Sequence, residues 1–535
     1  MKKDLSKNKI RLIIFSVALC ALLIFNYVFS YSLFSMSDVQ FQNLDNQMLS
    51  AAYSQSSNTK GVIIASDLSH DKGELSNLVH ELTKLGYGVY VFDYPSNGLS
   101  GGNIPFGIRE SDYLAEQFYC ALVSFSQLSG LSEKDIHLVG YGMGARGILH
   151  CAALGLIHPA SISLVGTDLN LSDSLQYDIL NFTVDSELSW VNELTSTTPG
   201  CDIHIVYSPV DEVSSAEDNE LLKNKLTGGI SSVARLNDVT TSSVFAIHSL
   251  LMYSPSVAGK VASYIADLDG MEYSRQFLLA IRPVSIVIML GLYMLLLICV
   301  ARAFPARRFG YTKIKMPENF FRDKILMVFA SVVVMAALAF GLYLVPIRYP
   351  YNDIVSLVLM CGYGVTMYVL YRYSSFAGGM GKYMFTGDRT GKYRFSLLAM
   401  VAISIGVGII SVCGFYNPLS IFIKWDWCII FSVLCSFTFY IDQMERQVLR
   451  LDAKQKKILV LINYLPIIIG FAVMLLLGVL SSAYKMVVMM LVILLCLSTE
   501  GIMRKVGCST RMTALYKGFL FSMVIFSQAS MFFYV

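Results

Sequence analysis

Charged residues are scarce in this chain of 535 residues, of which 15% are charged and 55% are hydrophobic. With a mean hydropathy of +0.57, this composition is typical of a membrane protein. The scarcity is uneven, because 28 acidic but only 10 basic residues lie between Asp38 and Glu272. A region of that charge repels phosphates, which argues against nucleic-acid binding and favours a solvated acidic surface.

Histidine is absent after position 248, since all seven histidines lie between His70 and His248. The apolar C-terminal half therefore has no histidine with which to bind haem or a metal ion. Three of the 11 cysteines (Cys120, Cys151 and Cys201) fall in the acidic region. Their spacing fits neither a zinc motif nor a disulfide framework, so we interpret them as small buried residues. The sequence implies no cofactor and no metal.

A glycine-rich turn at residues 140–144 has no reactive side chain at its central position, Gly142. An apolar strand at 136–139 runs into Gly140-Tyr141-Gly142-Met143-Gly144 and then into a helix. This layout resembles the nucleophile elbow of α/β-hydrolases, which reads Gly-x-Ser-x-Gly. Gly142 stands where the attacking serine belongs and offers neither oxygen nor sulfur. Ordinary covalent hydrolysis at this position is therefore excluded.

Three further landmarks resemble the same superfamily, in its lipase/serine-aminopeptidase-like branch, and in its order along the chain. The first strand ends in Ala65-Ser66-Asp67-Leu68, where the family builds part of its oxyanion hole. Residues 93–101 resemble the family's Asp-x-x-Gly-x-Gly-x-Ser turn. Asp211 follows a strand and His248 precedes a helix, which is the family's order of acid and histidine.

The resemblance implies a role for each of these residues. His248 is the expected base and Asp211 the acid that orients it, with Gly142 as the vacant nucleophile position. The backbone N–H groups of Leu68 and Met143 are the expected oxyanion-hole donors. Other interpretations stay open: Asp168 as the acid, Ser66 or Ser69 as a substitute nucleophile, and helix capping or surface roles for Asp211 and His248.

Apolar strands alternate with helical patterns between residues 60 and 269, which predicts a doubly wound, mostly parallel sheet of the α/β-hydrolase type. Only residues 170–200 are available for a cap over the site. We expect strands at 61–65, 87–93, 137–139, 162–166 and 203–207, and helices at 75–85, 110–129 and 255–267.

Long apolar runs flank this region. The run at 12–34 follows a basic start and predicts a retained signal anchor rather than a cleaved signal peptide. Three domains are expected: a tail and anchor at 1–35, a hydrolase-like domain at 36–271 and an eight-helix transmembrane domain at 272–535, with nine spans in total. The later spans are predicted at 278–301, 325–346, 353–371, 395–414, 425–441, 458–480, 484–502 and 518–535.

Basic residues alternate between the predicted loops. The N-terminal tail and the loops 302–324, 372–394, 446–457 and 504–517 hold 26 Lys and Arg, and the intervening loops hold three. The positive-inside rule then places the tail in the cytoplasm and the hydrolase-like domain and C-terminus outside the cell membrane. The acidic residues Asp353, Asp426, Asp442 and Glu500 fall at predicted span ends, so no ion or proton path is predicted.

Two functions follow from these observations. The first is a membrane-bound binding or scaffolding protein whose hydrolase-like domain has lost its nucleophile. The alternative is a hydrolase or acyltransferase that acts on a lipid or cell-envelope substrate, with His248 and Asp211 as base and acid. The expected partners are the lipid bilayer, together with a membrane protein or a lipid or envelope ligand, and no nucleic acid.

Overall fold

A computed structural model of the chain forms two compact units. The sheet unit contains Ile24–Ser285, and the helical unit contains Met1–Leu23, Ile286–Val412 and Ile421–Phe532. The domain boundaries expected after residues 35 and 271 stay predictions. The structure describes residues 2–67, 70–95, 97–102, 110–169, 190–191, 194, 200–228, 238–275, 277–303, 313–343, 351–373, 396–415, 425–476 and 480–527.

The sheet unit is built on eight strands in the order β1-β2-β4-β3-β5-β6-β7-β8. β1 and β2 pair antiparallel, β2 is antiparallel to β4, and the other neighbours are parallel. This mixed sheet fits the predicted α/β-hydrolase-like fold. The strands are β1 (Ser37–Gln42), β2 (Met48–Ser54), β3 (Gly61–Ala65), β4 (Gly88–Phe92), β5 (Ile136–Tyr141), β6 (Ser161–Val165), β7 (Asp202–Tyr207) and β8 (Val239–Ser243).

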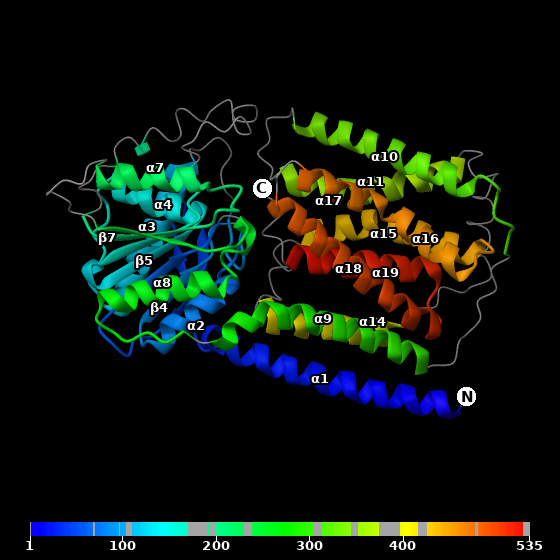
Figure 1. Cartoon of the computed structure of the whole chain (residues 1–535), viewed down its shortest axis with the longest axis horizontal. Helices are drawn as coiled ribbons and strands as arrows, with labels where there is room; N and C mark the ends of the chain where they lie inside the picture. The colour runs from blue at the N-terminus through cyan, green and yellow to red at the C-terminus, as the bar shows by residue number, and fades with distance from the viewer. Residues whose placement is uncertain are drawn as a thin grey trace. The chain divides into compact units, whose positions relative to one another are not determined.

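Helices cover both faces of this sheet (Figure 1). One apolar core joins α3, α4 and α7 to one face, and a second joins α2 and α8 to the other. Each core is continuous and buried, which is how a doubly wound sheet hides both faces from water. The bounds are α2 (Ser76–Lys84), α3 (Glu110–Ser129), α4 (Met143–Ala153), α7 (Ala216–Thr227) and α8 (Pro255–Leu268), with short 3-10 turns η1 (Lys72–Leu75), η2 (Glu133–Asp135) and η4 (His248–Leu250).

The register of the central strands brings the loop after β3 next to the elbow after β5. Ala65 pairs with Gly140 at the end of both strands, and Tyr141 pairs with Val165 of β6. Because parallel strands end at the same edge of a sheet, the residues that follow β3, β5 and β7 meet there. This edge carries the candidate site.

Described helices overlap each of the nine segments that the sequence predicts to span a membrane. By length and apolar composition, four of the described helices qualify as membrane spans, or five if the bent pair α16 and α17 counts as one. These apolar helices indicate a membrane protein, while the count of nine stays a prediction. The helices are α1 (Lys2–Phe34), α9 (Phe277–Ala303), α10 (Phe320–Tyr343), α11 (Tyr351–Tyr373), α14 (Leu397–Phe415), α15 (Trp425–Val448), α16 (Ala453–Asn463), α17 (Leu465–Leu476), α18 (Leu480–Lys505) and α19 (Thr510–Ser527).

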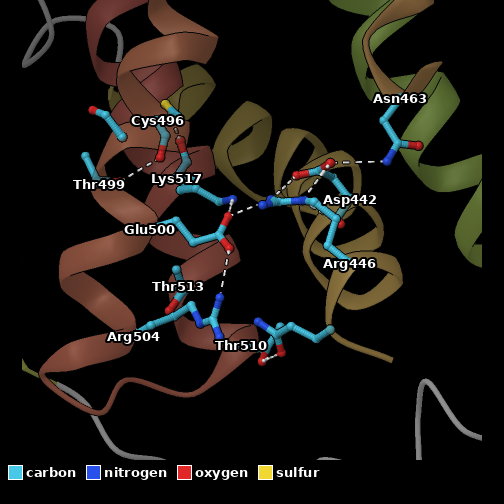
Figure 2. A network of polar contacts seen from close by, with 12 residues as sticks. Asp442, Arg446, Asn463, Cys496, Thr499, Glu500, Arg504, Thr510, Thr513 and Lys517 are labelled. Carbon is cyan, nitrogen blue, oxygen red and sulfur yellow. Dashed lines mark hydrogen bonds and ion pairs between the residues drawn. The ribbon is translucent and has the colours of Figure 1, made fainter. Parts of the chain in front are cut away.

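The helical unit contains a buried network of charged side chains, shown in Figure 2. Arg446 of α15 pairs with Asp442 on its own helix and with Glu500 of α18, whose Oε2 lies 2.7 Å from Arg446 Nη2. Lys517 of α19 binds the same Glu500 oxygen at 3.0 Å. Glu500 thus links three helices through charge-assisted bonds, which are stronger than neutral ones.

The network continues at the break between α16 and α17, which are bent by 51° relative to each other. The side-chain amide of Asn463 donates to Asp442 at 3.2 Å and to Glu445 at 3.0 Å. Lys324 of α10 also pairs with Glu445 and is fully buried. A proline near a helix end is a common cause of such a break, and Pro466 follows the last residue of α16 by three positions.

Some of the basic residues that the sequence analysis counted as loop cations lie within helices and bind buried carboxylates. Lys324, Arg446 and Lys517 are each paired with a buried carboxylate. Asp442 and Glu500, which the sequence analysis places at predicted span ends, are buried in this network. Hydropathy windows do not indicate such contacts, because they find apolar runs but not the polar pairs that helices bury between themselves.

Candidate functional site

The elbow keeps the backbone of a nucleophile turn. Gly142 has φ +50° and ψ −117°, a conformation that ordinary side chains rarely adopt and that the strained strand-to-helix turn of hydrolases requires. A Cβ atom on Gly140 would overlap the backbone of Ala145, and one on Gly144 would overlap the backbone oxygen of Ser66. The glycines on either side therefore keep the turn tight and close to the loop after β3.

The space above Gly142 is filled by the side chain of Asp67. A Cβ atom built on Gly142 would overlap the carboxylate of Asp67. One oxygen of this carboxylate, Oδ1, accepts a hydrogen bond of 2.8 Å from the backbone N–H of Met143. Asp67 therefore occupies the space that a side chain at position 142 would need, and it binds the predicted oxyanion-hole donor at the same time.

The second oxygen of Asp67 faces the predicted histidine. His248 Nε2 lies 3.2 Å from Asp67 Oδ2, and His248 Nδ1 lies 3.0 Å from both oxygens of Asp211. Asp211 is itself held by the backbone N–H groups of Val213 and Ser214, at 2.9 and 3.0 Å. The imidazole is thus fixed between two carboxylates, one from the loop after β3 and one from the loop after β7.

The electrostatics of the three side chains favour a charged histidine. Burial disfavours the imidazolium, but the charge of Asp211 and the hydrogen bonds to Asp211 and Asp67 outweigh it and raise the pKa of His248 well above its usual value. Burial likewise opposes ionisation of Asp67, but the hydrogen bond and charge of His248 outweigh it and lower the pKa of Asp67. Both pKa shifts favour an ion pair between His248 and Asp67.

Very little empty space remains beside this ion pair. The cavity bounded by Asp67, Gly142 and His248 has a volume of about 10 Å³, which is room for one water molecule at most. Its walls also include His70, Tyr141, Val165, Leu251 and Met252. The described residues leave no room for an ester or an acyl group next to the histidine.

The remaining sequence candidates have different fates. Ser66 is fully buried, and its hydroxyl has no hydrogen-bond partner among the described residues. The backbone N–H of Asp168 lies 3.4 Å from the carbonyl oxygen of Gly142, while the histidine binds Asp211 instead. Leu68 and Ser69, the other expected contributors to the oxyanion loop, lie outside the described residues, as does most of the cap segment at 170–200.

The Asp-x-x-Gly landmark is a structural turn beneath the site. The Asp93 carboxylate accepts from the backbone N–H and the ammonium group of Lys72, both at 2.6 Å, and from the N–H of Leu99 at 3.0 Å. This buried ion pair anchors the turn η1 that follows the Asp67 loop. Among the described residues, no cluster of three or more His, Cys, Asp or Glu is arranged to hold a metal ion.

Sequence reasoning missed the part that Asp67 plays. It was read only as a member of the oxyanion loop, where the family usually has His-Gly. The signal that points to it is a pairing of residue types: an acidic side chain after β3 together with a glycine in the nucleophile position. His70, whose ring pairs with Glu74 and lines the same cavity, was also missed.

Several solved structures are similar to the sheet unit. One is an esterase from Pyrococcus furiosus, with 16% sequence identity and a TM-score of 0.34; the match covers 44% of this chain and 91% of that chain. Another is mouse α/β hydrolase domain-containing protein 10, with 18% sequence identity and a TM-score of 0.33; the match covers 44% of this chain and 98% of that chain. A thioesterase domain from the curacin biosynthetic pathway is also similar, with 14% sequence identity and a TM-score of 0.32; the match covers 43% of this chain and 99% of that chain. Neither a protein-family model nor a curated protein sequence matches this chain. At these values the likeness carries no statement about activity.

Proposed function

We propose that this protein is a membrane-bound pseudo-hydrolase, whose sheet unit serves binding or scaffolding instead of covalent hydrolysis. The observation that carries the proposal is the Asp67 carboxylate, which accepts the N–H of Met143 and contacts His248 in the space above Gly142. Covalent hydrolysis of a substrate carbonyl requires a nucleophile, an oxyanion-hole donor and a histidine that is free to act as a base. Here the first is absent and the other two are engaged by Asp67.

The alternative function, a hydrolase or acyltransferase with His248 as base, requires a neutral imidazole beside an open cleft. Asp67 lies 3.2 Å from the nitrogen that would take the proton, and the neighbouring carboxylates raise the pKa of His248 well above its usual value. An imidazolium has no lone pair with which to accept a proton. Both observations favour the pseudo-hydrolase.

We further propose that the chain spans the cell membrane nine times, begins with a signal anchor at 1–35 and exposes the sheet unit on the outer side. Helices at all nine predicted segments support the number of spans. The excess of Lys and Arg in alternate loops supports the orientation, although Lys324, Arg446 and Lys517 no longer count toward it. The lipid bilayer is then the permanent partner of the protein.

The test uses the full-length protein in lipid nanodiscs. We expect no labelling by fluorophosphonate probes and no turnover of p-nitrophenyl esters, because there is no activated oxygen at position 142. The matched control is the His248→Gln variant, which should be equally inert. Ester turnover by the wild type that His248→Gln abolishes would overturn the pseudo-hydrolase proposal in favour of the enzyme.

A further inference from the structure

The Asp67 carboxylate sits in surroundings that suit an anion. Its partners are the N–H of Met143, which is the first residue of α4, and the ring of His248. The first turn of a helix carries free N–H groups and a partial positive charge, both of which favour a carboxylate. The Asp67 side chain therefore shows that this position accepts a carboxylate.

One residue that lines the same cavity carries a hydroxyl with no partner among the described residues. Tyr141 lines the small cavity beside Asp67 and is only 1% exposed. Its hydroxyl has no hydrogen-bond partner among the described residues. A buried donor without a partner costs free energy until a ligand or a water molecule satisfies it. The described contacts thus leave one buried hydroxyl of a cavity-lining residue unsatisfied.

We propose that the site binds carboxylates and that Asp67 is a tethered ligand whose place a carboxylate-bearing ligand can take. This proposal rests on the proposed function, because it names the ligand class of the same non-catalytic site. A tethered group competes at a high effective concentration. A free carboxylate should therefore bind poorly to the wild type and well once Asp67 is shortened.

The structure supplies a size-matched test. Asp67→Gly removes a CH₂–COO⁻ group, which has the size of acetate, and Asp67→Ala removes the carboxylate alone, which has the size of formate. Both variants are prepared as full-length protein at pH 6 and constant ionic strength. Thermal unfolding is followed against acetate and formate, with chloride as the reference anion. A ligand that binds only the folded state raises the Tm in a saturable manner.

We expect acetate to raise the Tm of Asp67→Gly, formate to raise that of Asp67→Ala more than acetate does, and neither to act on the wild type beyond chloride. Adding His248→Gln to Asp67→Gly should remove the acetate effect. An equal response of the wild type, or no saturable response of either variant, overturns the proposal. If neither variant responds to carboxylates and the wild type has no esterase activity, the carboxylate-site proposal is wrong and the pseudo-hydrolase proposal is unaffected. Esterase activity in the wild type overturns the pseudo-hydrolase proposal, regardless of the Tm response to acetate.

A separate observation concerns Arg282, near the start of α9. This arginine is 3% exposed and belongs to the same compact unit as the sheet. Its Nη1 donates to the Ser76 hydroxyl at 2.8 Å and to the Asn77 side-chain oxygen at 2.7 Å. Burying a guanidinium is costly, so contacts of this length are needed to hold it there.

These contacts lead to both sides of the site. Ser76 and Asn77 begin α2, directly after the turn η1 and the Asp67 loop. The amide of Asn77 donates 2.7 Å to the carbonyl of Tyr253, just after the turn η4 that begins at His248. One arginine of α9 is therefore linked, through Ser76 and Asn77, to the segment that carries Asp67 and to the segment that carries His248.

We infer that Arg282 is a positioning residue for the Asp67–His248 contact. Replacing it with methionine keeps most of the side-chain volume but removes the donors, which should loosen both segments and separate the two charges. The readout is the pKa of His248 in the full-length protein, from histidine NMR, with the resonance assigned by the His248→Gln variant. A role in stability alone would not move this value.

We expect Arg282→Met to lower the pKa of His248 toward its usual range and Arg282→Lys to restore part of the shift. Arg275→Met is the matched control, because Arg275 contacts Ser256 at an exposed position of the same unit, and it should have no effect. If Arg282→Met does not fold, Asn77→Leu removes the same link and should give the same shift. A wild-type pKa in folded Arg282→Met, or in Asn77→Leu, overturns the inference.

Discussion

At the scale of single residues, the exchange of two side chains explains the site. A serine at position 142 and an aspartate at position 67 need the same space, because a Cβ atom on Gly142 would overlap the Asp67 carboxylate. The histidine, its acidic partner and the tight turn are present together with the Asp67 carboxylate above Gly142. On the proposed function, loss of the nucleophile and closure of the site are one structural change.

The ion pair at the site gives the stability of the protein a defined pH dependence. The raised pKa of His248 contributes stability that is complete below its unfolded value of 6.5 and is lost as the pH rises through the folded value. The lowered pKa of Asp67 contributes stability that is complete above its unfolded value of 3.8 and is lost as the pH falls through the folded value. The pair thus stabilises most between these two values.

We therefore expect the Tm difference between the wild type and Asp67→Asn to be largest between about pH 4 and 6.5. The difference should shrink on the alkaline side as His248 loses its proton. Thermal unfolding at a series of pH values measures it. Ser66→Ala is the control, since this buried neighbour carries no charge. A Tm difference that grows steadily toward alkaline pH would contradict the assigned ion pair.

The sequence could predict part of this site. The chain order of Asp211 and His248 predicts that the two lie at one sheet edge, because the ends of parallel strands meet there. In the structure, His248 Nδ1 lies 3.0 Å from Asp211. The position of the Asp67 carboxylate above Gly142 could not be predicted. The sequence Ala-Ser-Asp-Leu does not indicate in which direction the loop points this side chain. That orientation depends on the open space that Gly142 leaves, which is a property of the packed structure.

At the scale of elements, the polar network ties the helices of the helical unit together. Glu500 of α18 is bound by Arg446 of α15 and Lys517 of α19, and all three side chains are largely shielded from solvent. The hydropathy of the sequence indicates these helices but not the ion pairs between them. In the sheet unit the edge strands β1 and β8 were missed for a similar reason, because Ser-Asp-Val-Gln-Phe-Gln and Val-Thr-Thr-Ser-Ser carry few apolar residues.

Glu500→Gln tests the network. Two buried cations lose their shared carboxylate, so we expect a loss of about 3–5 kcal/mol in the free energy of unfolding. Arg504→Gln is the matched control on the same helix, because Arg504 is half exposed and lies 4.0 Å from Glu500; it should cost about 1 kcal/mol or less. Denaturant unfolding in detergent gives both values. Equal losses in the two variants would mean that the buried pairs do not hold the helices together.

At the scale of the whole molecule, the proposed orientation places the sheet unit outside and the loop at 302–324 in the cytoplasm. The cysteine test must avoid Cys508, which is only 3% exposed. Lys134 of the sheet unit and Lys313 of that loop are exposed and serve instead. Both positions are tested as cysteine variants in intact cells, against the wild-type background.

An impermeant maleimide should label Lys134→Cys in intact cells, whereas Lys313→Cys should react only after the membrane is permeabilised. Protease added to intact cells should in the same way cut the 36–271 domain and spare 302–324. The opposite labelling pattern would reverse the orientation. Labelling of both positions in sealed cells would mean that the number of spans between them differs from the proposal.

The central claim is that Asp67 occupies the place of a nucleophile in an otherwise preserved elbow. Fluorophosphonate labelling of three full-length proteins, the wild type, Gly142→Ser and Gly142→Ser with Asp67→Gly, tests it most directly. We predict labelling of the double variant alone, because only there does a serine find free space, the N–H of Met143 and the His248–Asp211 pair. Equal labelling of both serine variants, or none of a folded double variant, would contradict the account.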